Sequence, residues 1–326
     1  SFALAAPSSP NSNVERKIDA QQQKQQAEQD AAILAQQTQS PHVRLEGEKE
    51  ASLSFPQNEA QCFPINQLVL TDYQAEEEKN SSASSLKLIQ PSQFSWALKS
   101  VYAERDFALP ACIGSERINV LLRRIQNRLI DFGYVTTRVV VEPQDLRSGM
   151  LVLTVIPGKV GRIQLQDQSA IPFATRGTLW FAMPMAQGDM LNIRNIEQGL
   201  ENLKRVSSAE ADVQLSPSEA IGETDVVISY KQRFPFHLTL GLDDSGSKAT
   251  GRLQGSATFS WDNVLTLNDL FYISGTRSFK RGSDNAEGDY GSKNVSLYYS
   301  IPWKNYLLTL SGSKYTYHQT VAGVLE

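Results

Sequence analysis

Two cysteines and three histidines are the residues of this sequence that could bind a metal ion or form a redox pair. Cys62 and Cys112 lie far apart, whereas zinc sites usually supply cysteines roughly two to four residues apart with histidines close by. His42, His237 and His318 are scattered along the chain and do not complete such a pattern. The spacing therefore favours a disulfide between the two cysteines, and we expect no metal ion.

Serine and carboxylate motifs do not combine into an enzyme site. Ser84 with Lys87, and Ser311 with Lys314, fit a Ser-x-x-Lys pattern, but the K-T-G element of acylating serine enzymes is absent. The run 76–78 of three glutamates is typical of a solvated surface. The sequence contains no H-E-x-x-H, no P-loop and no glycine motif for dinucleotides. We therefore predict a protein that is not an enzyme, with no catalytic residue and no cofactor.

Length and charge exclude further classes of protein. The 326 residues are enough for two or three domains. With 31 basic and 35 acidic residues and a net charge of -4, the chain lacks the positive field that attracts nucleic acids, so we expect no nucleic-acid partner. No apolar run approaches the roughly 18 residues of a membrane-spanning helix. If this chain enters a membrane, it must do so as a β-barrel.

The first residues are typical of the end of a secretory signal. Ala3-Leu4-Ala5 has the small-x-small form that signal peptidase cuts after. We therefore interpret residues 1–11 as a signal-peptide remnant and tail. Export would place the chain in an oxidising compartment, where a disulfide between the cysteines persists.

Residues 12–37 are predicted to form a polar helix. The segment 14–37 has no proline or glycine and is rich in alanine, glutamine, glutamate and lysine, which favour helix. Its apolar residues form no continuous stripe, so the helix could not dock firmly on an apolar core. Two interpretations stay open: a solvated or disordered tail, and a helix inside a water-filled lumen. Residues 38–58, with prolines and little periodicity, indicate a linker.

Residues 59–157 are predicted to form a first module of order β-α-α-β-β. Apolar residues recur with helical spacing from Ile118 to Leu129, and Gly133 stands where that helix should end. A polar insertion occupies residues 72–85. The expected strands are 65–71, 135–142 and 150–156, and the expected helices begin near Ser92 and Ser115.

Residues 158–231 are predicted to repeat that order in a second module. Asn192 is a typical cap for a helix that continues through Ile193, Ile196, Leu200 and Leu203. The expected strands are 160–166, 211–216 and 225–230, with a first helix around 171–181. A module with at most three strands has exposed strand edges, where a partner could add a strand or where charge and curvature simply protect the edge.

Residues 232–326 alternate apolar and polar side chains. The alternation runs through residues 236–243, 252–261 and 294–301, with Trp303 and Tyr306 at an expected aromatic girdle. A membrane barrel with its apolar residues facing outward explains the pattern, and a soluble antiparallel sandwich would also produce it. The segment has room for about five strands, whereas bacterial barrels have 8 or more, so we expect a longer protein.

Three motifs carry a resemblance to a known family. Cys62-Phe63-Pro64-Ile65 together with Cys112 resembles the cysteine-linked first POTRA module of the two-partner secretion (TpsB) transporters in the Omp85 superfamily. Residues 127–138 (NRLIDFGYVTTR), followed by PQDL at 143–146, resemble the helix-to-strand signature of that family, and residues 241–246 (GLDDSG) resemble the start of its barrel. Its members include exporters of haemolysins, filamentous haemagglutinin and contact-dependent inhibition toxins (ShlB/FhaC/HecB/CdiB-like).

The resemblance implies a multi-domain fold. It comprises an amino-terminal plug helix, two α+β POTRA modules and the first strands of an antiparallel transmembrane β-barrel of about 16 strands. It implies a monomeric outer-membrane pore of a Gram-negative cell, with its POTRA modules in the periplasm. The pore would recognise a large secreted exoprotein of the TpsA type by its N-terminal secretion domain, translocate it, and contact outer-membrane lipid and lipopolysaccharide. The alternative is an Omp85-type assembly or insertion factor.

Site residues follow from the same resemblance. The residues expected to plug the pore are Val14, Ile18, Gln22, Gln26, Gln29 and Ile33. Residues expected to bind the partner lie on strands and on the helix of the first module: Val135, Thr137, Val139, Asp225, Val227, Arg123 and Arg128. The cargo class stays open among a toxin, a haemolysin and an adhesin. A secreted binding protein that ends in a β-sandwich is a further alternative.

Overall fold

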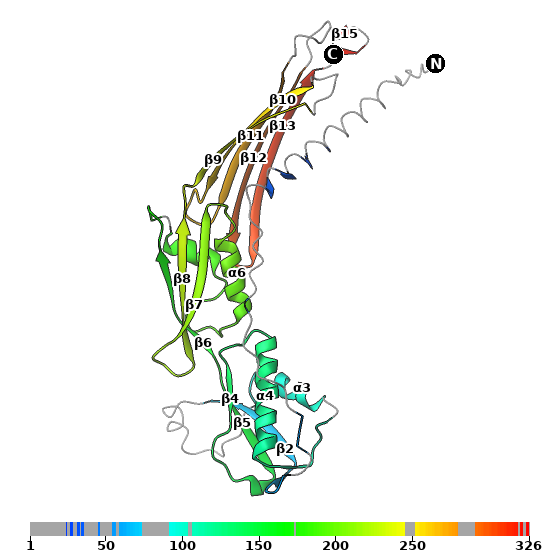
Figure 1. Cartoon of the computed structure of the whole chain (residues 1–326), viewed down its shortest axis with the longest axis vertical. Coiled ribbons are helices and arrows are strands. Elements are labelled where there is room, and N and C mark those ends of the chain that lie inside the picture. The colour runs from blue at the N-terminus through cyan, green and yellow to red at the C-terminus, as the bar shows by residue number, and fades with distance from the viewer. Residues whose placement is uncertain are drawn as a thin grey trace, which may run out of the picture.

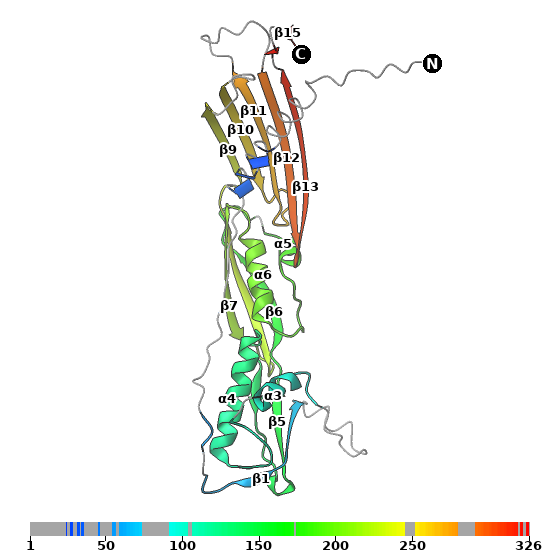
Figure 2. The ribbon, with the colours of Figure 1, turned by 90° about the vertical axis from the view of Figure 1, so that its right-hand side faces the viewer.

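The computed structural model describes most of the chain from the first cysteine onward. The described residues are 24, 27–28, 31–32, 34–35, 45, 54–56, 59–73, 91–103, 106–172, 174–244, 252–279, 291–318, 320–321 and 324–325. Two small α+β modules and a long sheet follow one another in a row, with the first module at one end and the sheet at the other (Figures 1 and 2). No described helix is both long and apolar enough to cross a membrane.

The first module has a three-stranded sheet of order β2-β5-β4. β5 is central, parallel to β2 and antiparallel to β4, and both helices precede β4 in the chain. A small antiparallel sheet of two strands, β1 with β3, and a short 3-10 helix, η1, complete the module. The bounds are β1 Phe63–Ile65, β2 Gln67–Asp72, α3 Ser95–Tyr102, β3 Ala111–Ile113, α4 Ser115–Asp131, β4 Arg138–Val140, η1 Leu146–Ser148 and β5 Met150–Ile156.

Helix α4 forms because its apolar residues recur on one face. Leu121, Ile125 and Leu129 are fully buried in one core with Leu151 and Leu153 of β5. At its start, the carboxylate of Glu59 accepts hydrogen bonds from the backbone N–H groups of Gly114, Glu116 and Arg117, which have no partner within the helix. At its end, Gly133 has φ 92°, a left-handed conformation that favours glycine. The predicted helix end is confirmed.

Two strand predictions for the first module differ from the structure. The expected strand 65–71 is divided at Asn66, whose N–H donates to the Gly149 carbonyl, so β1 and β2 are separate strands. The expected strand 135–142 is only three residues long, since Val135 and Thr136 lie in a turn. The strand ends after Val140 because the side chain of Gln144 binds the backbone carbonyl and N–H of Val152 on β5, which Glu142 would otherwise face.

The second module repeats the architecture of the first, with sheet order β6-β8-β7. β8 is central, parallel to β6 and antiparallel to β7. Asn192 caps α6 by accepting a hydrogen bond from the Arg194 N–H at 2.9 Å, as predicted. The first helix begins later than expected because Thr175 and Thr178 form a capping box. The bounds are β6 Lys159–Asp167, α5 Arg176–Ala182, α6 Ile193–Leu203, β7 Ala209–Pro217 and β8 Glu223–Gln232.

The long sheet is an antiparallel meander of five strands, so the predicted room for five strands is confirmed. Neighbours in the chain are neighbours in the sheet, in the order β13-β12-β11-β10-β9. The sheet curves but does not close on itself (Figure 2). The bounds are β9 Phe236–Asp243, β10 Leu253–Asp262, β11 Leu270–Phe279, β12 Gly291–Trp303, β13 Tyr306–His318, β14 Thr320–Val321 and β15 Val324–Leu325.

Candidate functional site

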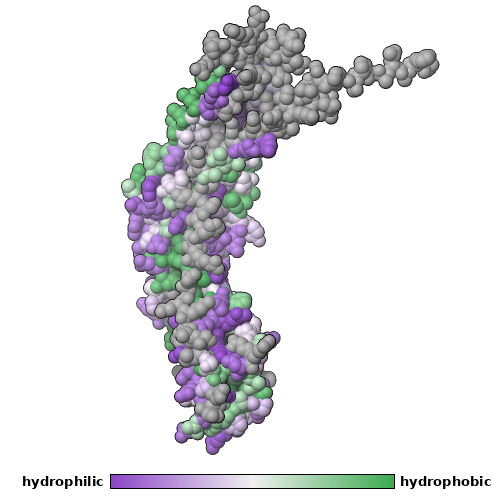
Figure 3. Space-filling model, turned by 45° about the vertical axis from the view of Figure 1, so that its right-hand side comes forward, coloured by the Kyte–Doolittle hydropathy of each residue, from purple (hydrophilic) through white to green (hydrophobic). Residues whose placement is uncertain are grey.

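The five-stranded sheet has two chemically different faces. One face carries hydroxyl side chains in register across neighbouring strands: Thr258, Ser274 and Ser296, all of them buried. The other face carries Leu238 and Leu242, which are 68% and 77% exposed, and Figure 3 shows hydrophobic residues along the convex margin of the strands. A pore built from strands needs a polar lumen and an apolar face toward lipid. The prediction of apolar residues outside and polar residues inside is confirmed.

Aromatic residues mark the end of the sheet that adjoins the second module. Trp303 ends β12 and pairs in register with Tyr306, which begins β13, and their ring centroids are 6.2 Å apart. Both side chains are exposed. Amphipathic rings at this level are typical of the boundary between lipid and water. Their position agrees with the aromatic girdle that the sequence predicts.

The six residues predicted to plug the pore lie outside the described residues. The described residues of the same segment are helical, namely Lys24, Ala27, Glu28, Ala31, Ala32, Leu34 and Ala35. They lie beside the five-stranded sheet, on the side away from its convex margin (Figures 1 and 2). Leu34 and Leu45 pack against the core of the second module, and the Leu45 N–H donates to Glu197 Oε1 at 2.6 Å. Leu34 and Leu45 thus hold the described part of this segment beside the polar face.

The second module and the sheet share one core and a polar junction. Leu270, Tyr272 and Tyr298 of the sheet cluster with Val226 and Ile228 of β8. Their contact fixes the second module against the base of the sheet, because a joint apolar core resists sliding.

Hydrogen bonds reinforce this junction. Asn202 donates to the carbonyl oxygens of Ala182 and Lys304, each at 2.7 Å. The guanidinium of Arg205 donates to the Ser300 hydroxyl, and Asp262 Oδ2 accepts from the Ser208 N–H at 3.1 Å. Burial lowers the pKa of Arg205, while the nearby Tyr298, Asp269 and Asp262 oppose that shift. The second module is therefore held in a fixed orientation to the polar face of the sheet.

Groups from outside the sheet bind both edges of the first module's sheet. At β4, Gln126 accepts from the Val139 N–H at 3.2 Å and donates to the Thr137 carbonyl at 2.7 Å. At β2, the Leu70 carbonyl accepts from the Ser92 N–H at 2.7 Å, and the backbone of Leu68 binds the Tyr102 hydroxyl. Addition of a partner strand there would have to displace these contacts.

The β7 edge of the second module is open. The Arg233 N–H donates to the Ser208 carbonyl across the β7–β8 pair, so the alternation of an antiparallel ladder directs the backbone of Ala211, Val213 and Leu215 away from β8. Within the described part of the chain, no group outside the sheet binds the backbone of Ala211 or Leu215. The Val213 N–H between them donates to Asp212 Oδ1 at 2.9 Å, a local side-chain contact that an added strand would replace. The outward N–H and C=O groups of this nine-residue strand can then accept an added strand.

The residues predicted to bind the partner lie in three separate places. Val135, Thr137 and Val139 lie at or beside β4, and the buried Thr137 accepts from the Gly158 N–H at the joint between the modules. Asp225 and Val227 lie on the central β8, whose two edges are occupied by β6 and β7, so strand addition cannot take place there. A role for these side chains in partner binding stays a prediction.

Arg123 and Arg128 lie on α4, away from β8. Arg128 lies 5.5 Å from the centroid of the Phe132 ring and 3.9 Å from Asp131 Oδ2, with its side chain half exposed. These contacts lie within or just beyond the helix, so they also have a purely structural explanation. Their predicted role in partner binding is likewise untested.

The predicted disulfide between Cys62 and Cys112 is present, with Cα atoms 5.3 Å apart. It joins the segment before β1 to β3, where Pro64 pairs with Cys112. Phe55 packs against Phe107 with ring centroids 5.1 Å apart, and Arg124 lies 4.2 Å above the Phe55 ring, so Phe55 belongs to the same module. The described residues contain no cluster of side chains suited to a metal ion.

Sequence reasoning missed three features of the site. Gln126 and Arg205 act through distant backbone and hydroxyl partners that no local pattern reveals. The openness of β7 depends on which strands are central, which the order of elements alone does not determine. The alternation of exposed Glu210, Asp212 and Gln214 with partly buried neighbours was the available signal for a half-exposed strand.

Comparison with known families divides the chain as the structure does. The model described as "Haemolysin secretion/activation protein ShlB/FhaC/HecB" matches residues 222–326. A POTRA domain model matches residues 159–217, and a ShlB-type POTRA domain model matches residues 97–158. Both modules and the five-stranded sheet thus have counterparts in described families.

Individual relatives are similar over most of this chain. The outer membrane transporter CdiB-2 of Burkholderia pseudomallei is 33% identical over 317 residues, covering 96% of this chain and 50% of the relative. The hemolysin transporter protein HpmB of Proteus mirabilis is 30% identical over 274 residues, covering 78% of this chain and 46% of the relative. The chain spans about half the length of the curated relatives it matches.

Solved structures share the fold. CdiB from Acinetobacter baumannii aligns with a TM-score of 0.72 at 24% identity, covering 99% of this chain and 57% of that structure. CdiB from Escherichia coli aligns with a TM-score of 0.66 at 23% identity, covering 100% of this chain and 54% of that structure. Both solved structures therefore share the fold of this chain over nearly all of its length.

Proposed function

Because the chain belongs to the two-partner secretion transporters of the Omp85 superfamily, we propose that it forms part of an outer-membrane pore for a large secreted exoprotein. The pore recognises this partner in the periplasm and translocates it to the cell surface. The observation that carries the proposal is the sheet itself. Its exposed apolar face suits lipid, and its polar face suits an unfolded, hydrated chain.

The proposed topology follows from the junction. The second module is fixed at the sheet end where Trp303 and Tyr306 lie, so both modules extend from one rim of the barrel (Figure 1). We place this rim at the periplasmic side of the outer membrane and the opposite strand ends at the cell surface. The pore acts as a monomer in contact with outer-membrane lipid, and it has no enzyme activity or cofactor.

Capture of the partner uses the β7 edge of the second module. Groups from outside the sheet bind both edges of the first module, whereas the backbone of Ala211 and Leu215 is unpaired within the described residues. A segment of the partner's N-terminal secretion domain adds to β7 as a further strand, and main-chain hydrogen bonds supply much of the affinity. The polar rather than apolar strand surface limits non-specific pairing.

The plug segment controls the pore. Its described helical residues lie beside the polar face of the sheet, and Leu45 of the linker is tied to Glu197 of α6. Residues 12–37 fill the lumen at rest and leave it when the partner docks. Folding of the partner outside the cell makes export directional without nucleotide hydrolysis.

Secretion by a reconstituted pair tests this function. The full-length transporter and the exoprotein encoded beside it are produced together in a host that lacks both, and the partner at the surface and in the medium is quantified. We expect surface partner only when both proteins are present and when the partner keeps its N-terminal secretion domain. Retention of the partner in the periplasm, combined with faulty insertion of unrelated barrels on deletion, would instead show an assembly factor.

A further inference from the structure

The lipid-facing side of the sheet contains a hollow of about 470 Å³. Its floor is formed by small residues that face outward on neighbouring strands: Gly255 and Ala257 on β10 and Gly275 on β11. A Cβ added to Gly275 would meet only the backbone oxygen of Asn294, at 3.8 Å. The missing side chain is therefore what leaves the space open.

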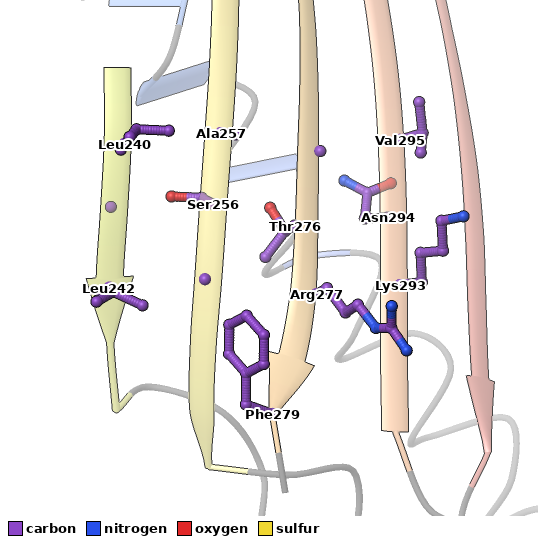
Figure 4. Close-up of a pocket in the computed structure, with 13 residues that line it drawn as sticks. Leu240, Leu242, Ser256, Ala257, Thr276, Arg277, Phe279, Lys293, Asn294 and Val295 are labelled. Atoms are coloured by element: carbon purple, nitrogen blue, oxygen red, sulfur yellow. The ribbon is translucent and has the colours of Figure 1, made fainter. Parts of the chain in front are cut away.

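Apolar and basic side chains flank this hollow on opposite sides. Leu240 and Leu242 of β9 lie on one side, and Arg277 of β11 and Lys293 of β12 lie on the other (Figure 4). Lys314 extends the basic side, because it pairs in register with Val295 on the same outer face. The hollow therefore offers apolar lining and positive charge within one site.

The basic side chains have no counter-charge within the described residues. Arg277 and Lys293 are exposed and directly opposite each other in the β11–β12 register. Like charges in that position destabilise a sheet unless an anion lies between them. In the part of the chain that the structure describes, the side chains of Arg277, Lys293 and Lys314 form no ion pair or hydrogen bond. The pattern calls for an anionic ligand.

The height of these residues in the membrane identifies that ligand. Lys293 precedes Trp303 on β12 by about ten residues, which is roughly 33 Å along the strand and about 25 Å across the membrane at the usual tilt. The apolar band of such a barrel is about 25 Å tall. The basic side chains thus lie at the interface opposite to the Trp303 and Tyr306 rings, where the headgroups of the outer leaflet are found.

We propose that this site binds the lipid A part of lipopolysaccharide. A phosphate lies between Arg277 and Lys293, and one acyl chain occupies the hollow over Gly275. Basic side chains at a membrane surface can simply extend their charges into water, which would explain the exposed cations. It would not explain the floor of small residues beside them. The inference depends on the proposed function only for placing the sheet in the outer membrane. It adds a specific lipid site to that function.

Binding of purified lipid A tests the site. The full-length transporter in detergent is titrated with diphosphoryl and monophosphoryl lipid A, and bound lipid is counted by native mass spectrometry. We expect R277Q/K293Q to bind diphosphoryl lipid A about 30-fold more weakly, since each cation near a lipid surface contributes about fivefold. For the wild type, loss of one lipid phosphate should weaken binding, whereas R277Q/K293Q should distinguish the two lipids less.

Further variants separate the hollow and the overall charge. Gly275→Leu fills the space without removing a charge and should weaken binding of both lipids. K159Q/K231Q removes the same charge from exposed positions of the second module and should bind as the wild type does. Equal binding by wild type, R277Q/K293Q and Gly275→Leu would overturn the site. Secretion assayed on the same proteins reports the proposed function separately, because loss of secretion with intact lipid A binding would contradict only that function.

Discussion

The carboxylate of Asp225 accepts three hydrogen bonds from Arg162, one from its backbone N–H at 2.8 Å and two from its guanidinium at 3.1 and 2.9 Å. The pair joins the central strand β8 to β6 at the irregularity between Val160 and Ile163. A Cβ on Gly161 would collide with Asp225 Oδ1, so glycine is required beside the carboxylate. The register of the second module's sheet is fixed at this point.

The Asp225–Arg162 pair predicts how acid affects the second module. Hydrogen bonds from the Arg162 backbone and guanidinium lower the pKa of Asp225 below its ordinary value. A lowered pKa in the folded state contributes stability above the unfolded pKa of about 3.9, and that stability is lost as pH falls through the folded value. Asp225→Asn should therefore weaken the module at pH 7 and remove this acid-dependent component.

Hydrogen exchange of β6 and β8 amides in the intact protein measures the effect, after correction for the intrinsic pH dependence of exchange. Wild type should keep its protection from pH 7 to about pH 5 and lose part of it near and below pH 4. Glu219→Gln, at an exposed position of the same module, is the matched control. It should change neither the protection at pH 7 nor the loss of protection near pH 4. Equal protection of Asp225→Asn and wild type at pH 7 would show that the Asp225–Arg162 pair does not stabilise the second module.

Replacement of Arg205 should loosen the junction between the second module and the barrel. Arg205→Met removes the bond to Ser300 and leaves the buried Asp262 without its nearby cation. Loss of a hydrogen bond to a charged group typically costs about 2 kcal/mol. Spin labels on Ser216 and Leu308 should then give a broader distance distribution. Lys204→Met removes an adjacent charge and should leave the distribution narrow; identical distributions for both variants would contradict this role of Arg205.

The disulfide should stabilise the first module. Closing a loop between Cys62 and Cys112 contributes about 4 kcal/mol when chain entropy dominates. Cys112→Ser should lower the urea midpoint of the module, followed through Trp96, whose ring centroid lies 4.4 Å from that of Phe132. Reductant should produce the same shift in wild type and none in the variant. Two free thiols in a non-reducing peptide map of the exported protein would refute the pairing.

Periodicity predicted those elements whose own side chains determine their structure. The spacing of Leu121, Ile125 and Leu129 correctly placed α4, and alternation correctly placed β9, β10 and β12. β11 and β13 were expected only as room in the chain, because Arg277 and Lys314 stand at outward positions where their alternation would need an apolar residue.

Features that depend on distant partners could not be predicted in this way. β4 is short because Gln144 binds the Val152 backbone on β5, and α4 begins where Glu59 binds its first N–H groups. The open edge of β7 became visible only when β8 proved central. The sequence thus predicted which modules exist and in what order, whereas the contacts that expose or cover their edges required the structure.

Deletion of residues 12–37 should open the pore. The segment is polar, and its described helical residues lie beside the polar face of the sheet. A helix that occupies a water-filled lumen blocks ions by filling it, so its removal should raise single-channel conductance in planar bilayers several-fold. Replacement of the same residues by an unrelated helix of equal length, fused to the intact linker, tests whether any helix that fills the lumen is enough to block ions. Conductance equal to that of the intact protein after deletion would argue decisively against a plug.

Proline on the β7 edge should stop export without unfolding the second module. The Leu215 N–H points away from β8, so Leu215→Pro removes a donor that an added strand would use and no hydrogen bond of the existing sheet. Strand addition needs a continuous row of main-chain bonds, and the proline ring also obstructs the approaching strand. We expect partner secretion to fall about tenfold or more while the barrel still assembles.

Two controls isolate the backbone from the side chain. Leu215→Ala removes the side chain, which is 37% exposed, but keeps the N–H, and should secrete at nearly the normal rate. Leu165→Pro makes the same change on the opposite edge strand β6 and distinguishes a specific edge from a general effect of proline. Protease resistance must first show that each variant is folded. If folded Leu215→Pro secretes as well as Leu215→Ala, capture does not use the β7 edge, and the side chains of α4, with Arg123 and Arg128, become the surface to test.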